Sequence, residues 1–430
     1  MHLPNLKQKT TEELLTLADK LGARLDCGGM RESPPRRQAL ILSILAAQEA
    51  ERDPITADGV LEILPDGFGF LRTLSGNYQP CPDDIYVSPS QIRRFSLRTG
   101  DTVYGQIRPP KESERYYALL KVESINGDDP ERCPRRRDFD DLTPQAPTEK
   151  FALAHDPAHI TARIVDLLCP LGRGQRCLIA GPPRTGKSTL IQALAEAITR
   201  AHDDVVVISV LVDARPEDIT EARERGFGEV VASRFDEPAT RHVQMAEIAL
   251  AKATRLAEKG RDVVVLLDSL THLARARAAL DDGAANKPAG ARGEPTPEHD
   301  LRRLLASAAK LAEGGSLSVI ATLHDHTGVA ADDELARSLA GVESARVQLD
   351  ATLMERRLFP CIDIFASGTR REERLLAPDT LDAIRTLRDR LHPLGKVGAI
   401  ARLRSEMRAH ETNSALLEHV CTALEPPTSP

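Results

Sequence analysis

The sequence predicts an α/β protein with a largely parallel sheet, preceded by a small β-barrel and a helical module. Beyond residue 156, near-continuous aliphatic runs alternate with helical stretches, as in strands buried on both faces of a sheet. Short apolar segments separated by glycine, proline and aspartate turns fill residues 54–127, which is typical of a barrel. At 430 residues and 41% hydrophobic content, the chain is expected to form two or three domains.

The cysteines and the charge balance limit the classes of protein. Seven cysteines are scattered without a C-x-x-C pair, which argues against a disulfide framework and against a zinc site. No apolar run approaches the roughly 18 to 20 residues that cross a membrane, and polar residues interrupt the first apolar stretch after Met1. We therefore expect a cytoplasmic protein with no membrane partner. The net charge of −7 means that any nucleic-acid site must be local.

Residues 1–52 are predicted to form the helical module. Thr10 and Glu13 have the spacing of a capping box, and four leucines then fall on one helical face: Leu14, Leu17, Leu21 and Leu25. A second helix is expected after the Pro34–Pro35 breaker, placed by Leu40, Ile41, Ile44 and Leu45. The two helices are expected to pack as a hairpin.

Residues 53–128 are predicted to form the barrel, with no helices. Its expected strands include Val60–Leu64, Ile85–Val87, Thr102–Ile107 and Tyr116–Val122. Residues 129–155 are rich in proline, aspartate and arginine, including Arg135–Arg137, and are predicted to be a solvated linker.

Residues 156–425 are predicted to form the α/β domain, followed by a frayed tail at 426–430. The aliphatic runs that indicate its buried strands are Cys177–Ala180, Val205–Val212, Val263–Leu267 and Leu317–Ala321.

A phosphate-binding motif follows the first of these runs. Gly181–Ser188 satisfies G-x-x-x-x-G-K-[ST], and a helix is expected directly after it, over Thr189–Ala201. Glycines allow backbone N–H groups to face phosphate oxygens, Lys187 can reach the β and γ phosphates of ATP, and Ser188 can ligate Mg²⁺. A chance match is expected in only about 1% of chains of this length.

The run Val263–Leu267 ends in Asp268, a carboxylate that can hold Mg²⁺ through water. A buried strand that ends in a solvated aspartate is common and is weak support by itself. Together with Lys187 it indicates a nucleoside triphosphatase that uses ATP and Mg²⁺.

Aromatic residues are concentrated in the predicted barrel. Eight of the fourteen phenylalanines and tyrosines lie within fifty residues: Phe68, Phe70, Tyr78, Tyr86, Phe95, Tyr104, Tyr116 and Tyr117. The segment Gly67–Phe70 would place two rings on one face of a strand, where glycine neighbours allow a nucleotide to come close. Such rings can stack on the bases of single-stranded RNA, although they could equally fill the barrel.

Charges in residues 54–127 nearly cancel, with eight Lys or Arg against nine Asp or Glu, which excludes a simple polycationic groove. Asp84 and Glu114 could accept hydrogen bonds from the amino group of cytosine, while Arg72 and Arg115 meet phosphate. This pattern favours cytosine-rich single-stranded RNA.

Several long segments resemble the Rho family of bacterial transcription terminators. In the front half these are Asp58–Leu64, Gly67–Arg72, Pro82–Phe95 and Ile107–Glu112, and in the back half Gly172–Arg176, Gly228–Ser233, Phe235–Ala239 and Ser367–Arg370. The similarity covers almost the whole chain. It implies an OB-fold RNA-binding domain, a RecA-like ATPase domain and a hexameric ring with ATP sites between subunits, which acts on RNA polymerase complexes.

The resemblance also implies site residues. The ATP pocket would comprise Gly172, Arg173, Gly174, Gln175, Arg176, Cys177, Arg184, Thr185, Gly186, Lys187, Ser188, Thr189 and Arg215, with Phe359 against the adenine. Arg370, with Arg357, would act on the γ-phosphate bound by the neighbouring subunit. Read from the residues alone, either arginine could instead form a surface ion pair. RNA contacts implied or proposed for the chain are Phe68, Phe70, Arg72, Asp84, Tyr86, Glu114, Arg115, Tyr116 and Lys287.

The chain departs from the family pattern at three places. Ala214 stands where the family has an acid that orients the attacking water, and Glu217 or Asp218 would have to substitute for it. Ala330 replaces a lysine of one pore loop, and Lys287–Gly293 lacks the usual glycine pair of the other. Loss of a positioned base typically removes about 10² to 10⁴ in rate.

Two functions follow from these features. The first is an RNA-dependent ATPase and 5′–3′ RNA helicase or translocase that terminates transcription. The second is an RNA- and ATP-binding regulatory ring with weak hydrolysis, which Ala214 and Ala330 favour. A DNA recombinase or rotary ATPase subunit is disfavoured by the aromatic barrel.

Overall fold

The computed structural model describes residues 1–23, 37–50, 54–111, 114–283 and 297–422. It divides into two compact units, Met1–Arg137 with Leu250–Arg255, and Asp138–Ala249 with Leu256–Pro430. Each unit is described by itself. Leu25 of the predicted first helix lies outside the described residues, as do Lys287 and the pore-loop segment around it.

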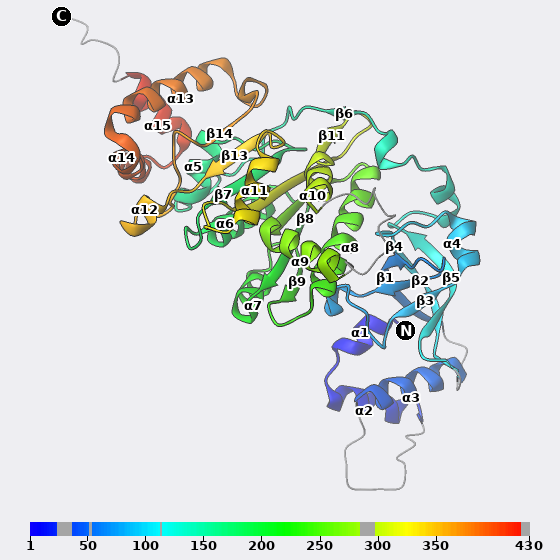
Figure 1. Ribbon diagram of the computed structural model, residues 1–430. Helices are drawn as coiled ribbons and strands as arrows, with labels where there is room; N and C mark the ends of the chain where they lie inside the picture. The colour runs from blue at the N-terminus through cyan, green and yellow to red at the C-terminus, as the bar shows by residue number, and fades with distance from the viewer. Residues whose placement is uncertain (24–36, 51–53, 112–113, 284–296, 423–430) are drawn as a thin grey trace, which may run out of the picture. The chain divides into compact units, whose positions relative to one another are not determined.

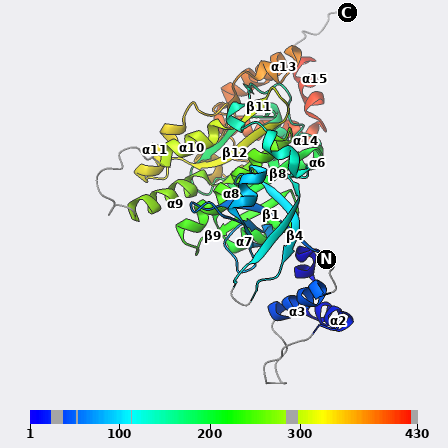
Figure 2. The same ribbon diagram turned by 90° about the vertical axis from the view of Figure 1, so that its right-hand side faces the viewer.

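The first unit begins with three helices, α1 (Leu3–Gln8), α2 (Thr11–Lys20) and α3 (Arg37–Ala50). The predicted capping box is present at the start of α2, where the Thr10 hydroxyl accepts from the Glu13 N–H and the Glu13 carboxylate accepts from the Thr10 N–H. Figures 1 and 2 show α2 and α3 side by side, which confirms the predicted hairpin.

A closed five-stranded barrel follows these helices, with the strand order β1-β2-β3-β5-β4. Its strands are β1 (Ile55–Ile63), β2 (Gly69–Arg72), β3 (Ile85–Val87), β4 (Thr102–Arg108) and β5 (Tyr117–Ile125). Alternate residues of β4 are buried, as expected for a strand with one face toward a core. Leucines and isoleucines from α1, α2 and α3 join the same hydrophobic core as the barrel strands.

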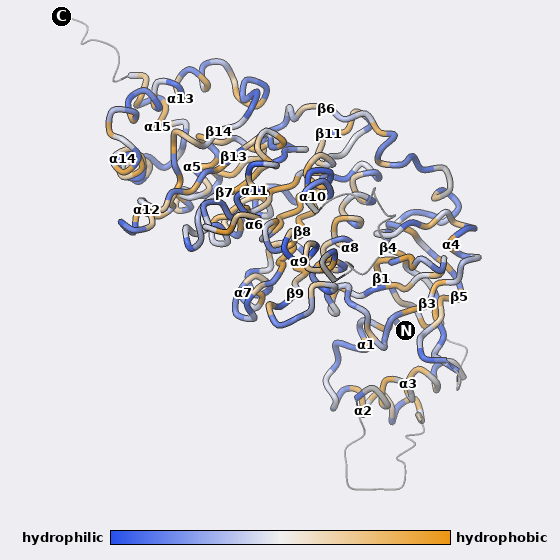
Figure 3. The backbone as a smooth tube through the Cα atoms, in the orientation of Figure 1, coloured by the Kyte–Doolittle hydropathy of each residue, from blue (hydrophilic) through white to orange (hydrophobic). Residues whose placement is uncertain are grey.

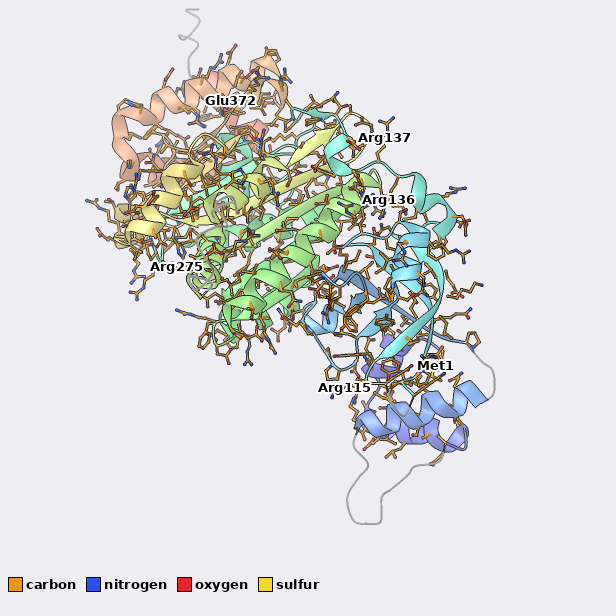
Figure 4. All side chains as sticks on the ribbon, turned by 45° about the vertical axis from the view of Figure 1, so that its right-hand side comes forward. Met1, Arg115, Arg136, Arg137, Arg275 and Glu372 are labelled. Carbon is orange, nitrogen blue, oxygen red and sulfur yellow. The ribbon has the colours of Figure 1, made fainter. Side chains whose placement is uncertain are left out.

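Two expectations for this unit were wrong. A helix, α4 (Pro89–Phe95), lies between β3 and β4; Ser88 and Gln91 form a capping box at its start, a signal already present in the sequence. The expected linker is not uniformly solvated, because Arg136 (labelled in Figure 4) forms ion pairs with the fully buried carboxylate of Asp101. A buried carboxylate requires such a partner.

The second unit is built on a nine-stranded sheet whose main path is β14-β13-β7-β12-β10-β8-β9, with β11 paired to β12 and β6 paired to β11. The strands are β6 (Pro144–Gln145), β7 (Arg176–Gly181), β8 (Val205–Ala214), β9 (Glu229–Arg234), β10 (Asp262–Asp268), β11 (Ala309–Leu311), β12 (Ser316–His324), β13 (Ala345–Gln348) and β14 (Gly368–Thr369). From β13 to β9 all neighbours are parallel. All four aliphatic runs of the sequence are strands of this sheet, as predicted.

Helices follow most strands, as a parallel sheet requires. They are α5 (Ile160–Leu168), α6 (Lys187–Ala201), α7 (Pro216–Arg225), α8 (Ala239–Glu258), α9 (Leu270–Gly283), α10 (Pro297–Ala306), α11 (Ala330–Leu339), α12 (Ala351–Glu355), α13 (Pro378–Leu391), α14 (Gly395–Ala409) and α15 (Asn413–Thr422). Figure 3 shows apolar residues along the central strands, and the last three helices pack on one another. Among the described residues, no helix is long and apolar enough to cross a membrane.

Candidate nucleotide site and RNA-binding face

The phosphate motif lies between β7 and α6, the strand and helix that the sequence predicted around it. Gly186 has φ +92, a left-handed conformation that glycine adopts without strain. Lys187 folds back over the loop, and its Nζ donates to the carbonyl oxygens of Gly181 at 2.8 Å and Pro182 at 2.7 Å. The loop therefore holds the shape of a phosphate cradle at a helix N-terminus.

Lys187 is only 5% exposed, and its burial has an electrostatic consequence. Desolvation lowers the pKa of Lys187 to about 8, while the nearby carboxylates of Asp325 and Asp268 oppose the shift. A cation held in this way gains from an anionic ligand, because phosphate oxygens replace the lost hydration.

Asp268 ends β10 beside this loop, and it can serve a magnesium ion. One of its oxygens accepts from the Thr322 hydroxyl at 2.5 Å, and Ser188 at the start of α6 is exposed. Among the residues that the structure describes, no three His, Cys, Asp or Glu side chains gather as a metal cage. One carboxylate and one hydroxyl fit Mg²⁺, which is usually completed by substrate phosphates and water.

A pocket of about 510 Å³ adjoins the cradle and suits an adenine ring. Its lining includes Thr185, Gly186, Thr189 and Phe359, of which Phe359 is 44% exposed. Arg184 is also exposed in the cradle loop. These predicted ATP residues are brought together in one chain.

The predicted ATP residues of Gly172–Cys177 are not part of that pocket. This segment precedes or begins β7, whereas the cradle starts at Gly181, the last residue of that strand. The five steps from Arg176 to Gly181 span about 16 Å. Arg173 is occupied by the carboxylates of Asp204 and Asp262, and Cys177 is fully buried in the core. In the same chain these residues cannot contact the nucleotide, so the predicted set divides between two ends of the sheet.

The arginines predicted for the nucleotide site also lie at opposite ends of the parallel strands. Arg215 caps α7 beside the end of β8, at the cradle edge of the sheet. Arg370 follows β14, and its N–H bonds to Ser344, whose side chain in turn bonds to Gln175 near the start of β7. Arg357 is exposed near Phe359. Arg370 therefore lies too far from the cradle of its own chain to contact the same phosphates.

Four aromatic rings form a cluster on the barrel. Phe70 makes edge contacts with Phe68 at 5.7 Å, Tyr86 at 6.2 Å and Tyr116 at 4.8 Å between ring centroids. Leu71, the next residue of β2, belongs to the barrel core, whereas Phe70 does not. Since successive residues of a strand face opposite sides, the Phe70 ring lies outside the barrel interior. Its neighbours cover the Phe70 ring, which is 8% exposed, whereas Phe68 and Tyr86 are half-buried and Tyr116 is 38% exposed.

The glycine beside these rings has a different role from the expected one. A Cβ at Gly69 would lie 2.7 Å from the carbonyl oxygen of Glu62, because β1 and β2 approach closely there. Glycine at this position is required for strand pairing rather than for contact with a nucleotide.

Arg72 and Asp84 form a buried ion pair next to the aromatic cluster. Arg72 also binds Glu62, with Nε and Nη2 at 2.7 and 2.6 Å from its Oε2, and it lies 5.1 Å from the Phe70 ring. With two carboxylates around it and 4% exposure, Arg72 does not suit a phosphate, which corrects the expected role. Asp84 Oδ1 is buried, and among the described residues no group donates a hydrogen bond to it.

Burial raises the pKa of Asp84, while the Cys81 N–H and Arg72 oppose this shift. Glu114 is exposed and paired with Arg108 at 2.5 and 2.8 Å, which lowers the pKa of Glu114 to about 2. It is therefore a hydrogen-bond acceptor at neutral pH. Arg115, labelled in Figure 4, is exposed and available to phosphate.

Sequence reasoning missed three groups at the cradle edge of the sheet. His272 and His324 contact one another with ring centroids 5.1 Å apart, and the buried carboxylate of Asp325 affects Lys187. His324 and Asp325 follow an aliphatic strand, which was the signal available in the sequence.

The departures from the family pattern are visible at the same edge. Ala214 ends β8 with a half-buried methyl group that cannot bind water. In the loop before α11, the Thr327 hydroxyl donates to Asp332 at 2.8 Å, and Val329 is 48% exposed immediately before Ala330. The tip of this loop is therefore apolar.

Both parts of the chain, the barrel and the domain with the nucleotide cradle, are similar to known protein families. Residues 57–131 match the family described as Rho termination factor, RNA-binding domain, and residues 161–369 match the nucleotide-binding domain of the ATP synthase alpha/beta family. An ATPase from the type III secretion system of pathogenic bacteria has a similar fold, with a TM-score of 0.53 and 22% identity over 66% of this chain and 88% of that one.

Full-length relatives are more informative. Transcription termination factor Rho of Pseudomonas fluorescens biotype C is 45% identical over 96% of this chain and 98% of its own length. The corresponding factor of Chromobacterium violaceum is 43% identical over 97% and 99%, and that of Salmonella typhimurium is 42% identical over the same shares. With its barrel, its nucleotide cradle and this identity along nearly the whole length, the chain belongs to the transcription termination factor Rho family.

Proposed function

We propose that the protein is an RNA-stimulated ATPase that moves 5′ to 3′ along single-stranded RNA and releases transcripts from RNA polymerase. The observation that carries this proposal is the presence, in one chain, of a closed phosphate cradle and an aromatic cluster that is partly exposed at Tyr116, beside a buried carboxylate oxygen to which no described residue donates. The first feature suits ATP with Mg²⁺, and the second suits unstacked bases.

Cytosine is the base that the barrel fits best. Asp84 Oδ1 can accept from its amino group, and Arg72 fixes the Asp84 carboxylate beside the Phe70 ring. Phe68 and Tyr86, whose centroids are 5.7 Å apart, supply further surface for stacking. Glu114 and Arg115 extend this face with an acceptor and a cation.

A ring of identical subunits, a hexamer in this proposal, would complete the nucleotide site. Within one chain, Arg370 and Gly172–Arg176 lie at the opposite end of β7 from Lys187. In a closed ring with head-to-tail contacts, the Arg370 end of one subunit meets the cradle of the next. This places the arginine on the γ-phosphate, where such a group contributes strongly to phosphoryl transfer. The proposed location is the cytoplasm.

The rate of ATP hydrolysis with and without poly-cytidine RNA tests this function. We expect RNA to raise turnover at least tenfold, and Lys187→Ala to abolish it. Leu394→Ala is a suitable control, since this exposed side chain lies between α13 and α14, outside the cradle and the barrel. Turnover equal to that of Lys187→Ala, with or without RNA, would contradict the enzyme function.

A second function is favoured by one specific feature, the methyl group at Ala214. In that case the protein is a regulatory ring that binds ATP and RNA but hydrolyses ATP slowly. ATP-dependent binding of cytosine-rich RNA without turnover above the Lys187→Ala level would support this alternative.

A further inference from the structure

Imidazole and carboxylate groups that the proposed function does not use gather at the carboxyl ends of the central strands. Asp213 is near the end of β8, His324 ends β12, and His272 lies in the first turn of α9 after β10. The phosphate cradle follows β7, the neighbour of β12 in the same parallel sheet. In open α/β sheets, ligands bind at this edge.

Asp213 is held in an uncommon backbone conformation with φ +59, which non-glycine residues rarely adopt. Its carboxylate lies 3.5 Å from His272 Nδ1 and 4.0 Å from His242 Nε2. His242 is itself fixed by the Ser233 hydroxyl at 2.8 Å. The acid that remains beside Ala214 is therefore directed at an imidazole, His272.

The contacts of His272 determine which of its nitrogens is free. Nδ1 lies 3.3 Å from the carbonyl oxygen of Val212, which can only accept, and 3.5 Å from Asp213. The proton is therefore placed on Nδ1, and Nε2 keeps its lone pair. Within the described part of the chain, His272 Nε2 has no hydrogen-bond partner, so it can accept from water.

His324 connects this pair to the phosphate cradle. The His324 ring packs edge-on against His272 at 5.1 Å between centroids, and the backbone N–H of His324 donates to the Thr271 hydroxyl at 2.8 Å. Burial lowers the pKa of His324 to about 4, and Lys187 and His272 add to this shift. His324 is thus neutral near pH 7 and does not compete for Asp213. His324 of β12 pairs with Gly181 of β7, the first residue of the phosphate motif, so the histidine pair lies beside the cradle.

From this geometry we propose that His272, held by Asp213, orients the water that attacks the γ-phosphate, in place of the acid absent at Ala214. The inference rests on the proposed ATPase function and identifies a residue for it. In the enzyme, the water oxygen forms a bond to the γ-phosphorus while the bond between that phosphorus and the β–γ bridging oxygen breaks. The proton of the water passes to His272 Nε2 and then to solvent or phosphate, and ADP leaves with the bonding electrons.

Steady-state ATP hydrolysis by His272→Asn tests this role in the full-length protein with RNA present. Asparagine can still donate to the Val212 carbonyl but lacks the distal nitrogen. We expect kcat to fall at least tenfold, while KM and the affinity for a fluorescent ATP analogue stay within twofold. His326→Asn is the matched control, because His326 is an exposed histidine on the same edge with no bond to Asp213; its kcat should be unchanged.

A rescue experiment separates an orienting role from a structural one. Adding Ala214→Glu to His272→Asn should restore at least half of the lost kcat, because a carboxylate then binds the water directly. Full activity in His272→Asn, or a loss that Ala214→Glu does not recover although nucleotide affinity is intact, would overturn the proposal. If the wild-type protein does not hydrolyse ATP above the Lys187→Ala level, the proposed ATPase function itself fails.

Discussion

At the scale of single residues, Lys187 links nucleotide binding to proton uptake. Its burial lowers its pKa to about 8, below the usual value near 10.4. The folded protein therefore binds fewer protons than the unfolded chain between these two values, and the free energy of unfolding rises with pH through this range as far as Lys187 contributes. A bound triphosphate supplies negative charge and raises the pKa again.

The rise in the pKa of Lys187 on binding of ATP can be measured by calorimetry. At pH 8.5, binding of ATP should be accompanied by uptake of up to one proton, seen as a heat that depends on the ionisation enthalpy of the buffer. At pH 6.5, where Lys187 is already protonated, this component should nearly vanish. Lys187→Arg is the control, since a guanidinium stays protonated throughout. Equal proton uptake by the wild type and Lys187→Arg would assign the effect to another group.

A second prediction at this scale concerns the aromatic cluster. Tyr86→Ala should weaken binding of a short cytidine oligomer by about 1 to 3 kcal/mol, the value typical of one stacked base. Tyr104→Ala is a matched control, because Tyr104 contacts His2 rather than this cluster. Fluorescence anisotropy with labelled RNA provides the measurement. Similar losses in both variants would argue against a specific stacking face.

At the scale of elements, strands and caps were predictable where a local pattern decides them. The capping box at Thr10 was predictable because two side chains three residues apart form it. The aliphatic runs of β7, β8, β10 and β12 were predictable because continuous apolar residues reflect burial on both faces of a sheet. Helix α4 was missed although Ser88 and Gln91 signalled it, since the turn-rich surroundings favoured strands.

The candidate site was only partly predictable for a different reason. The cradle is contiguous in sequence, so Lys187 and Ser188 could be recognised from spacing alone. The other groups at this edge are far apart in the sequence: Asp213 lies in β8, His272 in the first turn of α9 after β10, and His324 at the end of β12. Only the order of strands in the sheet brings them together. The ion pair between Arg72 and Asp84, which makes Arg72 unsuitable for phosphate, likewise joins β2 to the turn before β3. No local sequence pattern indicates this contact.

The loop before α11 is an element whose missing charge can be restored. Val329 is exposed there, and Ala330 is the first residue of α11. Ala330→Lys should strengthen binding of RNA in the presence of ATP, and the plot of log affinity against log salt should become steeper by about 0.7 for each added phosphate contact. Ala330→Gln, which adds length without charge, is the control. No change in salt dependence would show that this loop does not approach RNA.

At the scale of the whole molecule, the division of site residues between two ends of the sheet predicts that activity requires contact between copies. Lys187 follows the last residue of β7, whereas Arg370 lies near its start. We expect Arg370→Ala to abolish RNA-stimulated turnover although its chain keeps Lys187. We expect Lys187→Ala to do the same although its chain keeps Arg370. Ala366→Ser, a change at an exposed position just before the Ser367–Arg370 segment, should keep full activity.

Mixing the two inactive variants tests whether the site is shared. In a randomly mixed ring, about a quarter of the interfaces pair an intact Lys187 from one subunit with an intact Arg370 from the next, so partial turnover should reappear. The measurement is ATP hydrolysis after the two proteins are mixed under conditions that allow subunit exchange, with each variant alone as the reference. A mixture as inactive as its components, although exchange is verified with labelled subunits, would mean that Arg370 does not act on a neighbour's nucleotide.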